Sequence, residues 1–210
     1  MTLETTIILL FQLAILLLSV MLHEIAHGLM ALKLGDQTAK LAGRLTLNPV
    51  KHLDPVGSFF VPLLLFLTNS PVILGWAKPV PYNPNLLFKD YKYGPLKVAL
   101  AGPATNLLIA LVLGLLMRFG VGFLSPVAVS YLSSIVILNI LLAIFNLMPI
   151  PPLDGSKILT TFLPPRYRLA LESVGFIGIF VVLIFLFFFF NFIIDLSYSI
   201  FNLIVGPGVL

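Results

Sequence analysis

The chain has 210 residues, of which 60% are hydrophobic and only 10% are charged, and its mean hydropathy is +1.12. The net charge of +4 is small and dispersed, which excludes a nucleic-acid partner, and the absence of cysteine excludes disulfides, thiolate catalysis and cysteine-based metal sites. We therefore expect an all-α polytopic membrane protein with about four transmembrane helices, in which any metal is held by histidine and carboxylate.

The first expected span, Thr5 to Leu34, contains ionisable residues at membrane depth. Residues 23–27 read HExxH. Residues four apart on a helix lie on one face, so His23 and His27 can reach one zinc ion while Glu24 flanks it as a general base. An ionisable residue within a span is a functional residue by default. Cleavage of this segment as a signal peptide would discard the motif, so we expect it to be retained.

A polar connection, Gly35 to Gly57, follows this span and offers a hydrated approach to the metal. Within it Leu41 to Leu47 has the turn-bounded, threonine-containing pattern of a short strand. We expect this membrane-associated β-like stretch to present an edge that receives an extended peptide, with a plain amphipathic connector as the alternative. His52, in the same polar loop, is expected to form hydrogen bonds or to act in gating rather than to bind metal.

A fifth hydrophobic segment, Ser58 to Leu74, is short and is interrupted by Pro62, Asn69 and Pro71. If this segment dips into the membrane and returns, 11 of the 12 basic residues lie on one side and only Arg118 lies on the other. Basic residues mark the cytoplasmic side. We therefore expect a re-entrant segment, with both chain ends outside and the site on the cytoplasmic side. A segment that crosses is the alternative.

Three further spans follow, at Leu96 to Phe119, Val127 to Met148 and Val174 to Ile194. The remaining apolar tail, Leu196 to Val205, is too short to cross and is expected to lie along the membrane interface.

A zinc site with three protein ligands keeps one coordination position open, so a third ligand is needed. Asp154 is one candidate. It follows three prolines, at positions 149, 151 and 152, that must end the preceding helix near the membrane surface. Irregular backbone there allows its carboxylate to point back to the metal, although an ordinary turn has the same pattern. Glu172 is the rival ligand, next to Arg166 and Arg168.

Together these motifs resemble the site-2 protease family of intramembrane zinc metalloproteases, in its small prokaryotic type without a PDZ domain. The resemblance covers most of the chain and also rests on Asn-x-x-Pro-x-x-Pro-Leu-Asp-Gly at 146–155, Gly-Arg-Leu-Thr-Leu-Asn-Pro at 43–49, His-x-Asp-Pro-x-Gly at 52–57, Gly-Trp-Ala-Lys-Pro-Val-Pro at 75–81 and Ala-Gly-Pro-x-x-Asn at 101–106. It implies that His23, His27 and Asp154 hold one Zn²⁺ and that Glu24 is the catalytic acid/base. The chain departs from the family pattern at Ile150, where a shorter motif has Asn, and at Ser156, often a second Gly. Neither departure removes a ligand.

Two asparagines are candidates for supporting roles. Asn106 is a candidate catalytic residue, because an amide on the second span can donate to the developing oxyanion. Packing between helices is the equal alternative for this residue. Asn146 is expected to fix the loop that carries Asp154.

The resemblance implies hydrolysis of peptide bonds in or near transmembrane segments of membrane-tethered substrate proteins, which is regulated intramembrane proteolysis. We expect residues 1–210 to form a single membrane-embedded metalloprotease domain in the plasma membrane of a prokaryote, with membrane-spanning proteins and the lipid bilayer as partners. The alternative is a catalytically silent membrane scaffold or a metal transporter that uses the same histidine cluster. Transport would require further acidic or histidine residues along a path, and the sequence has a single cluster.

Overall fold

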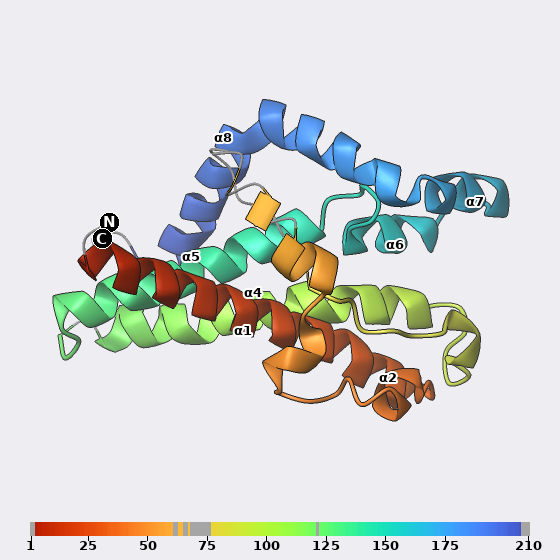
Figure 1. Cartoon of the computed structure of the whole chain (residues 1–210), viewed down its shortest axis with the longest axis horizontal. Helices are drawn as coiled ribbons and strands as arrows, with labels where there is room; N and C mark the ends of the chain where they lie inside the picture. The colour runs from red at the N-terminus through yellow and green to blue at the C-terminus, as the bar shows by residue number, and fades with distance from the viewer. Residues whose placement is uncertain (1–2, 61–62, 65–66, 68–76, 121, 207–210) are drawn as a thin grey trace.

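The computed structural model describes residues 3–60, 63–64, 67, 77–120 and 122–206, and over these residues the fold is all-helical (Figure 1). The elements in chain order are α1 (Leu3–Leu34), α2 (Thr38–Leu41), η1 (Pro49–His52), η2 (Pro55–Phe60), η3 (Pro84–Leu86), α4 (Gly94–Gly120), α5 (Pro126–Asn146), α6 (Asp154–Thr160), α7 (Pro165–Ser173), η4 (Gly175–Ile177) and α8 (Gly178–Val205).

Four helices, α1, α4, α5 and α8, are long and apolar enough to cross a membrane. Their positions confirm the four expected spans, with the start of α8 four residues later than expected. Helix α1 packs along α4, and α5 packs between α4 and α8 (Figure 1). The short helices α2, α6 and α7 gather toward one end of this bundle.

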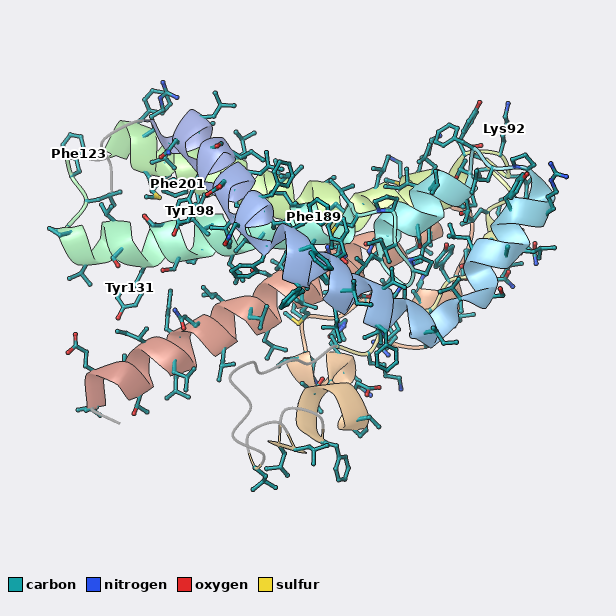
Figure 2. All side chains as sticks on the ribbon, turned by 90° about the horizontal axis from the view of Figure 1, so that it is seen from above. Lys92, Phe123, Tyr131, Phe189, Tyr198 and Phe201 are labelled. Carbon is teal, nitrogen blue, oxygen red and sulfur yellow. The ribbon has the colours of Figure 1, made fainter. Side chains whose placement is uncertain are left out.

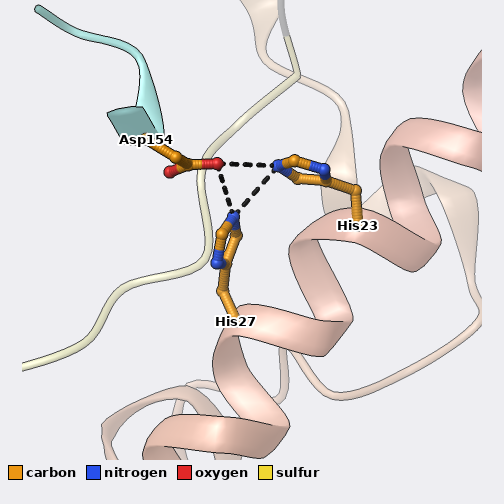
Figure 3. A group of neighbouring side chains, drawn as sticks. All are labelled: His23, His27 and Asp154. Atoms are coloured by element: carbon orange, nitrogen blue, oxygen red, sulfur yellow. Dashed lines mark hydrogen bonds and ion pairs between the residues drawn. The ribbon is translucent and has the colours of Figure 1, made fainter. Parts of the chain in front are cut away.

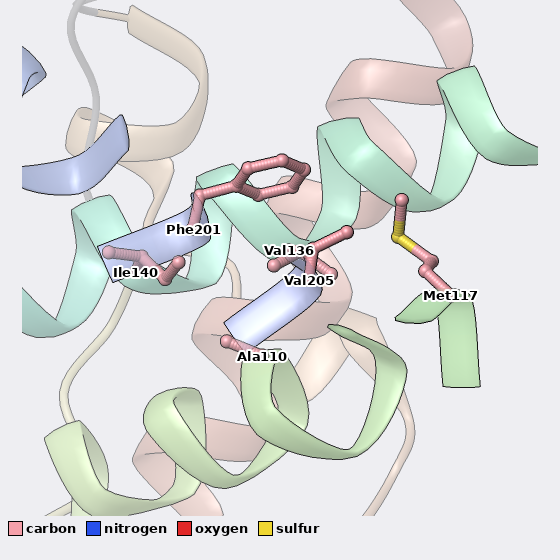
Figure 4. Close-up of a cluster of buried hydrophobic side chains, with 6 residues drawn as sticks. All are labelled: Ala110, Met117, Val136, Ile140, Phe201 and Val205. Atoms are coloured by element: carbon pink, nitrogen blue, oxygen red, sulfur yellow. The ribbon is translucent and has the colours of Figure 1, made fainter. Parts of the chain in front are cut away.

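The apolar core lies where α4, α5 and α8 meet (Figure 4). Its fully buried side chains are Ala110, Met117, Val136, Ile140, Phe201 and Val205. Gly114 of α4 allows α8 to come close, because a Cβ there would lie 2.5 Å from Ile204 Cγ2. The expected interfacial tail is therefore wrong. Residues 196–205 continue α8 without a break, and burial of Phe201 and Val205 against α4 and α5 holds them in the bundle.

The connections before and after α4 lie at opposite ends of the bundle. Figure 2 shows Lys92, in the connection before α4, and Phe123, in the connection after α4, at opposite ends of the long axis. Phe123 is 95% exposed. Arg118 lies near the Phe123 end, where its guanidinium donates to the carbonyls of Leu203 and Ile204 at the end of α8.

The β-like stretch expected at Leu41 to Leu47 is wrong, because these residues form no strand. Leu41 ends α2, and Gly43 then turns the chain with a φ of +63°, a left-handed conformation that suits glycine. Beyond the turn, the buried Arg44 side chain donates to the carbonyl of Lys78. The segment is thus fixed by a turn and by side-chain contacts instead of a strand ladder.

The expected re-entrant segment, Ser58 to Leu74, lies mostly outside the described residues. Its first three residues belong to η2, a single turn that follows Asp54. The Asp54 carboxylate accepts hydrogen bonds from the amides of Val56 and Gly57 at the start of this turn. The described part of the chain gives no support to a re-entrant path.

Candidate metal centre

Three buried side chains from two distant parts of the chain converge on one point (Figure 3). His23 and His27 come from α1, and Asp154 is the first residue of α6. The His23 and His27 Nε2 atoms each lie 3.0 Å from Asp154 Oδ2, and they lie 3.0 Å from each other. The three ligand atoms thus form a nearly equilateral triangle, which fits the interpretation that Asp154 is the third ligand.

Close packing at the start of α6 brings Asp154 to the two histidines. A Cβ on Gly155 would overlap the backbone carbonyls of Leu147 and Met148, so only glycine allows α6 to approach the end of α5 this closely. The next residue, Ser156, is buried and donates its hydroxyl to the Leu153 carbonyl at 2.7 Å. The departure from a second glycine therefore leaves the turn intact.

The hydrogen bonds of the two histidines suit a metal. His27 Nδ1 lies 2.7 Å from the carbonyl of Val98, and His23 Nδ1 lies 2.6 Å from Asn106 Oδ1. A carbonyl oxygen only accepts, so we assign the ring proton to Nδ1 in each case, which leaves both Nε2 lone pairs free. Two lone pairs and a carboxylate oxygen would repel one another without a cation between them. Ligands at about 2.0–2.1 Å around a tetrahedral zinc would be about 3.3 Å apart, close to the observed separations.

Glycine also keeps the space beside the ligands open. Gly102 of α4 is buried, and a Cβ there would overlap the Nε2 atoms of both His23 and His27. The α4 backbone can therefore approach the ligand atoms without filling the space between them. The donor set and this clearance both fit a zinc ion held by His23, His27 and Asp154.

Glu24 is held by the main chain of the segment before η3. Its Oε2 accepts a hydrogen bond of 2.7 Å from the amide of Val80. Gly28, one turn further along α1, permits this approach, since a Cβ there would lie 2.9 Å from Val80 Cγ1. One carboxylate oxygen of Glu24 is thus fixed by the main chain, on the helix that carries His23 and His27.

The Val80 segment is itself fastened on both sides. The amide of Lys78 donates to the His52 carbonyl at 2.9 Å, and the amide of Asn83 donates to Asp36 Oδ2 at 2.6 Å. The contacts of Lys78, Val80 and Asn83 define what we call the Val80 segment, residues 77–83. It joins the polar connection after α1 to the residue that flanks the metal ligands.

Asn106 belongs to a buried polar chain that ends on a ligand. Its Oδ1 faces His23, and its Nδ2 donates to Asn139 Oδ1 at 2.8 Å; Asn139 in turn donates to Ser19 Oγ at 3.0 Å. The chain connects α4 and α5 to α1. Asn139 and Ser19 were not expected from the sequence, although an asparagine in the middle of an apolar span is a signal that could have indicated the first of them.

Three other residues expected near the site lie elsewhere or are not described. Asn146 donates to the Leu142 carbonyl within α5, so this contact does not fix the loop that carries Asp154. His52 is fully buried, and its Nε2 lies 2.9 Å from the Thr46 carbonyl, in keeping with a hydrogen-bonding role. The side chain of Glu172, the rival ligand, lies outside the described part of the chain.

Lys157 was not expected from the sequence but lies next to the triad. Its Nζ is 3.2 Å from Asp154 Oδ1, the oxygen that does not face the histidines. Burial alone would lower the pKa of Lys157, but the nearby Asp154, Tyr82 and Glu24 outweigh burial and raise that pKa above its usual value. Lys157 is therefore a cation at physiological pH.

Comparisons with known proteins identify the family. The model of Peptidase family M50 matches residues 123–189. The chain is 40% identical over 178 residues to "Putative zinc metalloprotease YwhC" of Bacillus subtilis, covering 80% of this chain and 77% of the relative. It is 34% identical over 174 residues to "Putative zinc metalloprotease Rip2" of Mycolicibacterium smegmatis, covering 80% and 64%.

An archaeal relative, "Zinc metalloprotease MJ0392" of Methanocaldococcus jannaschii, is 28% identical over 153 residues, which cover 73% of this chain and 34% of the relative. No solved structure matches the chain. The relatives named as zinc metalloproteases agree with the donor set of the triad and with the four apolar helices. The chain belongs to peptidase family M50, the site-2 protease family, and is a membrane-embedded zinc metalloprotease.

Proposed function

We propose that this protein hydrolyses peptide bonds in or near the transmembrane segments of membrane-tethered substrate proteins. The observation that carries the proposal is the position of the triad: three buried ligand atoms lie on α1 and α6 within a bundle of four apolar helices. A zinc protease whose ligands start from a membrane-crossing helix acts where membrane-spanning substrates are found. Residues 1–210 then act as one membrane-embedded protease domain.

In this proposal His23, His27 and Asp154 hold the metal, and Glu24 is the acid/base. Zinc, when bound, supplies a Lewis acid that polarises the peptide carbonyl and lowers the pKa of water. Glu24 takes a proton from the attacking water and passes it to the leaving amine. The amide of Val80 holds Oε2 of Glu24, so that Oε1 is the oxygen available for this transfer.

We assign Asn106 a positioning role instead of a direct contact with the oxyanion. Both ends of its amide are engaged, with Oδ1 on His23 and Nδ2 toward Asn139. Through Nδ1 it keeps the His23 ring in the tautomer and orientation that present Nε2 to the metal. The Val98 carbonyl does the same for His27.

We place the protein in the plasma membrane of a prokaryote with the metal toward the cytoplasm. The described short helices near the triad share their end of the bundle with Lys92, whereas Arg118 lies at the other end. An excess of basic residues marks the cytoplasmic side. Substrates then reach the metal from the bilayer or from the cytoplasmic surface.

The test is cleavage by the purified protein of a panel of single-span substrates in liposomes, with and without a chelator. We expect cleavage that stops on chelation and returns with added zinc. Glu24→Gln should keep about one zinc per chain and lose activity by about 10²- to 10⁴-fold, because it removes the base and no ligand.

Two results would count against the proposal. Cleavage of soluble, unstructured peptides alone, with no single-span substrate cut, would restrict the enzyme to non-membrane substrates. Full activity in Glu24→Gln would remove Glu24 from the reaction.

A further inference from the structure

The two oxygens of Asp154 have different partners. Oδ2 lies 3.0 Å from each ligand nitrogen, while Oδ1 lies 3.2 Å from Lys157 Nζ. The two residues are three apart on α6, so they lie on the same helix face. The carboxylate therefore has one oxygen directed at the metal site and the other directed at a cation.

This division matters because a carboxylate can offer a metal either one oxygen or both. If both oxygens of Asp154 bound zinc, they would occupy the coordination position that a protease must leave for water and substrate. An ammonium group on Oδ1 competes for that oxygen and also sets the rotation of the carboxylate. Among the described residues, Lys157 is the one whose side chain is paired with Asp154 Oδ1.

We propose that Lys157 is a positioning residue of the metal centre, which holds Asp154 Oδ1 so that Asp154 binds zinc through Oδ2 alone. The proposal rests on the proposed metal site. It goes beyond that site by adding a cation, Lys157, that determines whether Asp154 binds zinc through one oxygen or through both. Lys157 touches no reacting atom and acts through Asp154.

The surroundings of Lys157 support this role. Its ammonium lies 6.0 Å from the centre of the Tyr82 ring, which belongs to the Val80 segment that holds Glu24. The Asp154 side chain is only 7% exposed whereas the Lys157 side chain is 44% exposed, so the carboxylate of this ion pair is shielded from water while the lysine reaches it from a partly exposed position. The pair Lys97–Asp90 is a useful contrast, because its side chains are 52% and 21% exposed and its carboxylate is not one of the three clustered residues His23, His27 and Asp154.

The test compares Lys157→Met, which keeps the length of the side chain but removes its charge, with Lys157→Arg, which keeps the charge. Lys97→Met is the matched control. Zinc affinity is measured by competition with a chelator in detergent, and the Co²⁺-loaded proteins are compared by visible absorption, which reports the number of ligands around the metal. Circular dichroism verifies that each variant retains its helices.

We expect Lys157→Met to lower zinc affinity by about 10- to 100-fold, the usual effect of losing a partner of a metal ligand. The cobalt spectrum should lose intensity, as a second carboxylate oxygen raises the coordination number. Lys157→Arg and Lys97→Met should stay within about threefold of the wild type, because the first keeps the cation and the second lies outside the site.

A second comparison excludes a merely structural role. In an Asp154→Asn background, Lys157→Met should have no further effect on zinc affinity, because Lys157 acts only through the carboxylate. If Lys157→Met alone fails to fold, Lys157→Arg decides: a wild-type cobalt spectrum with retained affinity supports the proposal, and a changed spectrum overturns it.

Failure of this inference and failure of the proposed function give different results. Wild-type affinity and an unchanged cobalt spectrum in a folded Lys157→Met would overturn the positioning role and leave the metal site in place. A wild-type protein that binds no zinc would overturn the metal site itself.

Discussion

Each ligand histidine is oriented by an oxygen from α4. His27 uses a backbone carbonyl, that of Val98, and His23 uses the side chain of Asn106. The HExxH spacing predicts that both rings face one point, but it contains nothing about these acceptors. Asn106 could be chosen from the sequence because it is a polar residue in an apolar span, whereas Val98 could not, because any residue supplies a carbonyl.

Asp154 and Lys157 also show that the partners of a site residue cannot be chosen from the sequence before the fold is known. The proline-rich stretch before Asp154 indicates a broken helix, and the structure places this residue at the start of α6 beside the histidines. The sequence left Glu172 as a rival because a third ligand cannot be chosen without the fold. Lys157 carried a weaker signal, because the sequence shows only a basic residue three positions after an expected ligand. That spacing brings the two side chains together only if the segment is a helix, as α6 is.

Gly102 gives a prediction that depends on a single methyl group. Gly102→Ala should reduce zinc affinity by about 10- to 100-fold, because the new Cβ would overlap the Nε2 atoms of both His23 and His27 and force the rings or α4 to move. The measurement is bound zinc per chain after dialysis against a weak chelator. Gly122→Ala is the control, since a Cβ at that position meets no atom within 4 Å. Equal zinc content in the two variants would show that the His23 and His27 rings accommodate a Cβ at position 102, and would contradict the prediction.

At the scale of elements, the length of the hydrophobic segments predicted the four spans, but it did not predict where the last span ends or how residues 41–47 fold. The expected tail at 196–205 failed because length alone does not reveal that Phe201 and Val205 are buried by α4 and α5. The expected strand at 41–47 failed for a different reason. Gly43 turns the chain, and the fixing contact of Arg44 comes from Lys78, a residue 34 positions away, so no local pattern could report it.

The Val80 segment depends on one buried carboxylate, Asp36. Burial alone would raise the pKa of Asp36, but hydrogen bonds from the Thr38 hydroxyl and from the amides of Asn83 and Thr38 outweigh burial and lower it. A carboxyl group whose pKa is lower in the folded state stabilises that state above its unfolded pKa of about 3.9. This stabilisation is lost as the pH falls through the folded pKa.

Asp36→Asn should therefore destabilise the protein at neutral pH by about 1–3 kcal/mol, because its amide places a donor against the Asn83 amide. The difference from the wild type should shrink as the pH falls below about 4, because Asp36 then takes up a proton in the unfolded chain first and, at lower pH, in the folded protein as well. Thermal unfolding in detergent at several pH values measures both effects. Glu4→Gln, at the exposed start of α1, is the control. A difference that stays constant down to pH 3 would rule out ionised Asp36 as its source.

For the whole molecule, four candidate spans are compatible with chain ends on one side of the membrane, and the proposed orientation depends on where the basic residues lie. The described residues contain four such helices, and Lys92 and Phe123 lie at opposite ends. Composition was sufficient to predict a helical membrane protein, because lipid leaves few other ways to pair the backbone. Whether Ser58 to Leu74 crosses the membrane is the part of the topology that hydropathy alone could not decide.

Cysteine labelling tests this orientation without background, because the chain has no cysteine. Phe123→Cys should react with an impermeant reagent added outside intact cells. Lys92→Cys should react only after the membrane is permeabilised, since the proposal places the basic end in the cytoplasm. Labelling of Lys92→Cys from outside would reverse the orientation of the metal centre.

The hydrogen bond to Glu24 comes from the main chain of Val80, and this has a consequence for how the site can be altered. Replacing the Val80 side chain changes the packing against Gly28 but leaves the N–H in place, and among ordinary substitutions only proline removes it. An alanine scan along this stretch would thus overlook the contact. In the proposed mechanism, the position of Glu24 depends on the backbone path of residues 77–83, whereas the side chains along that path can vary as long as the path is kept.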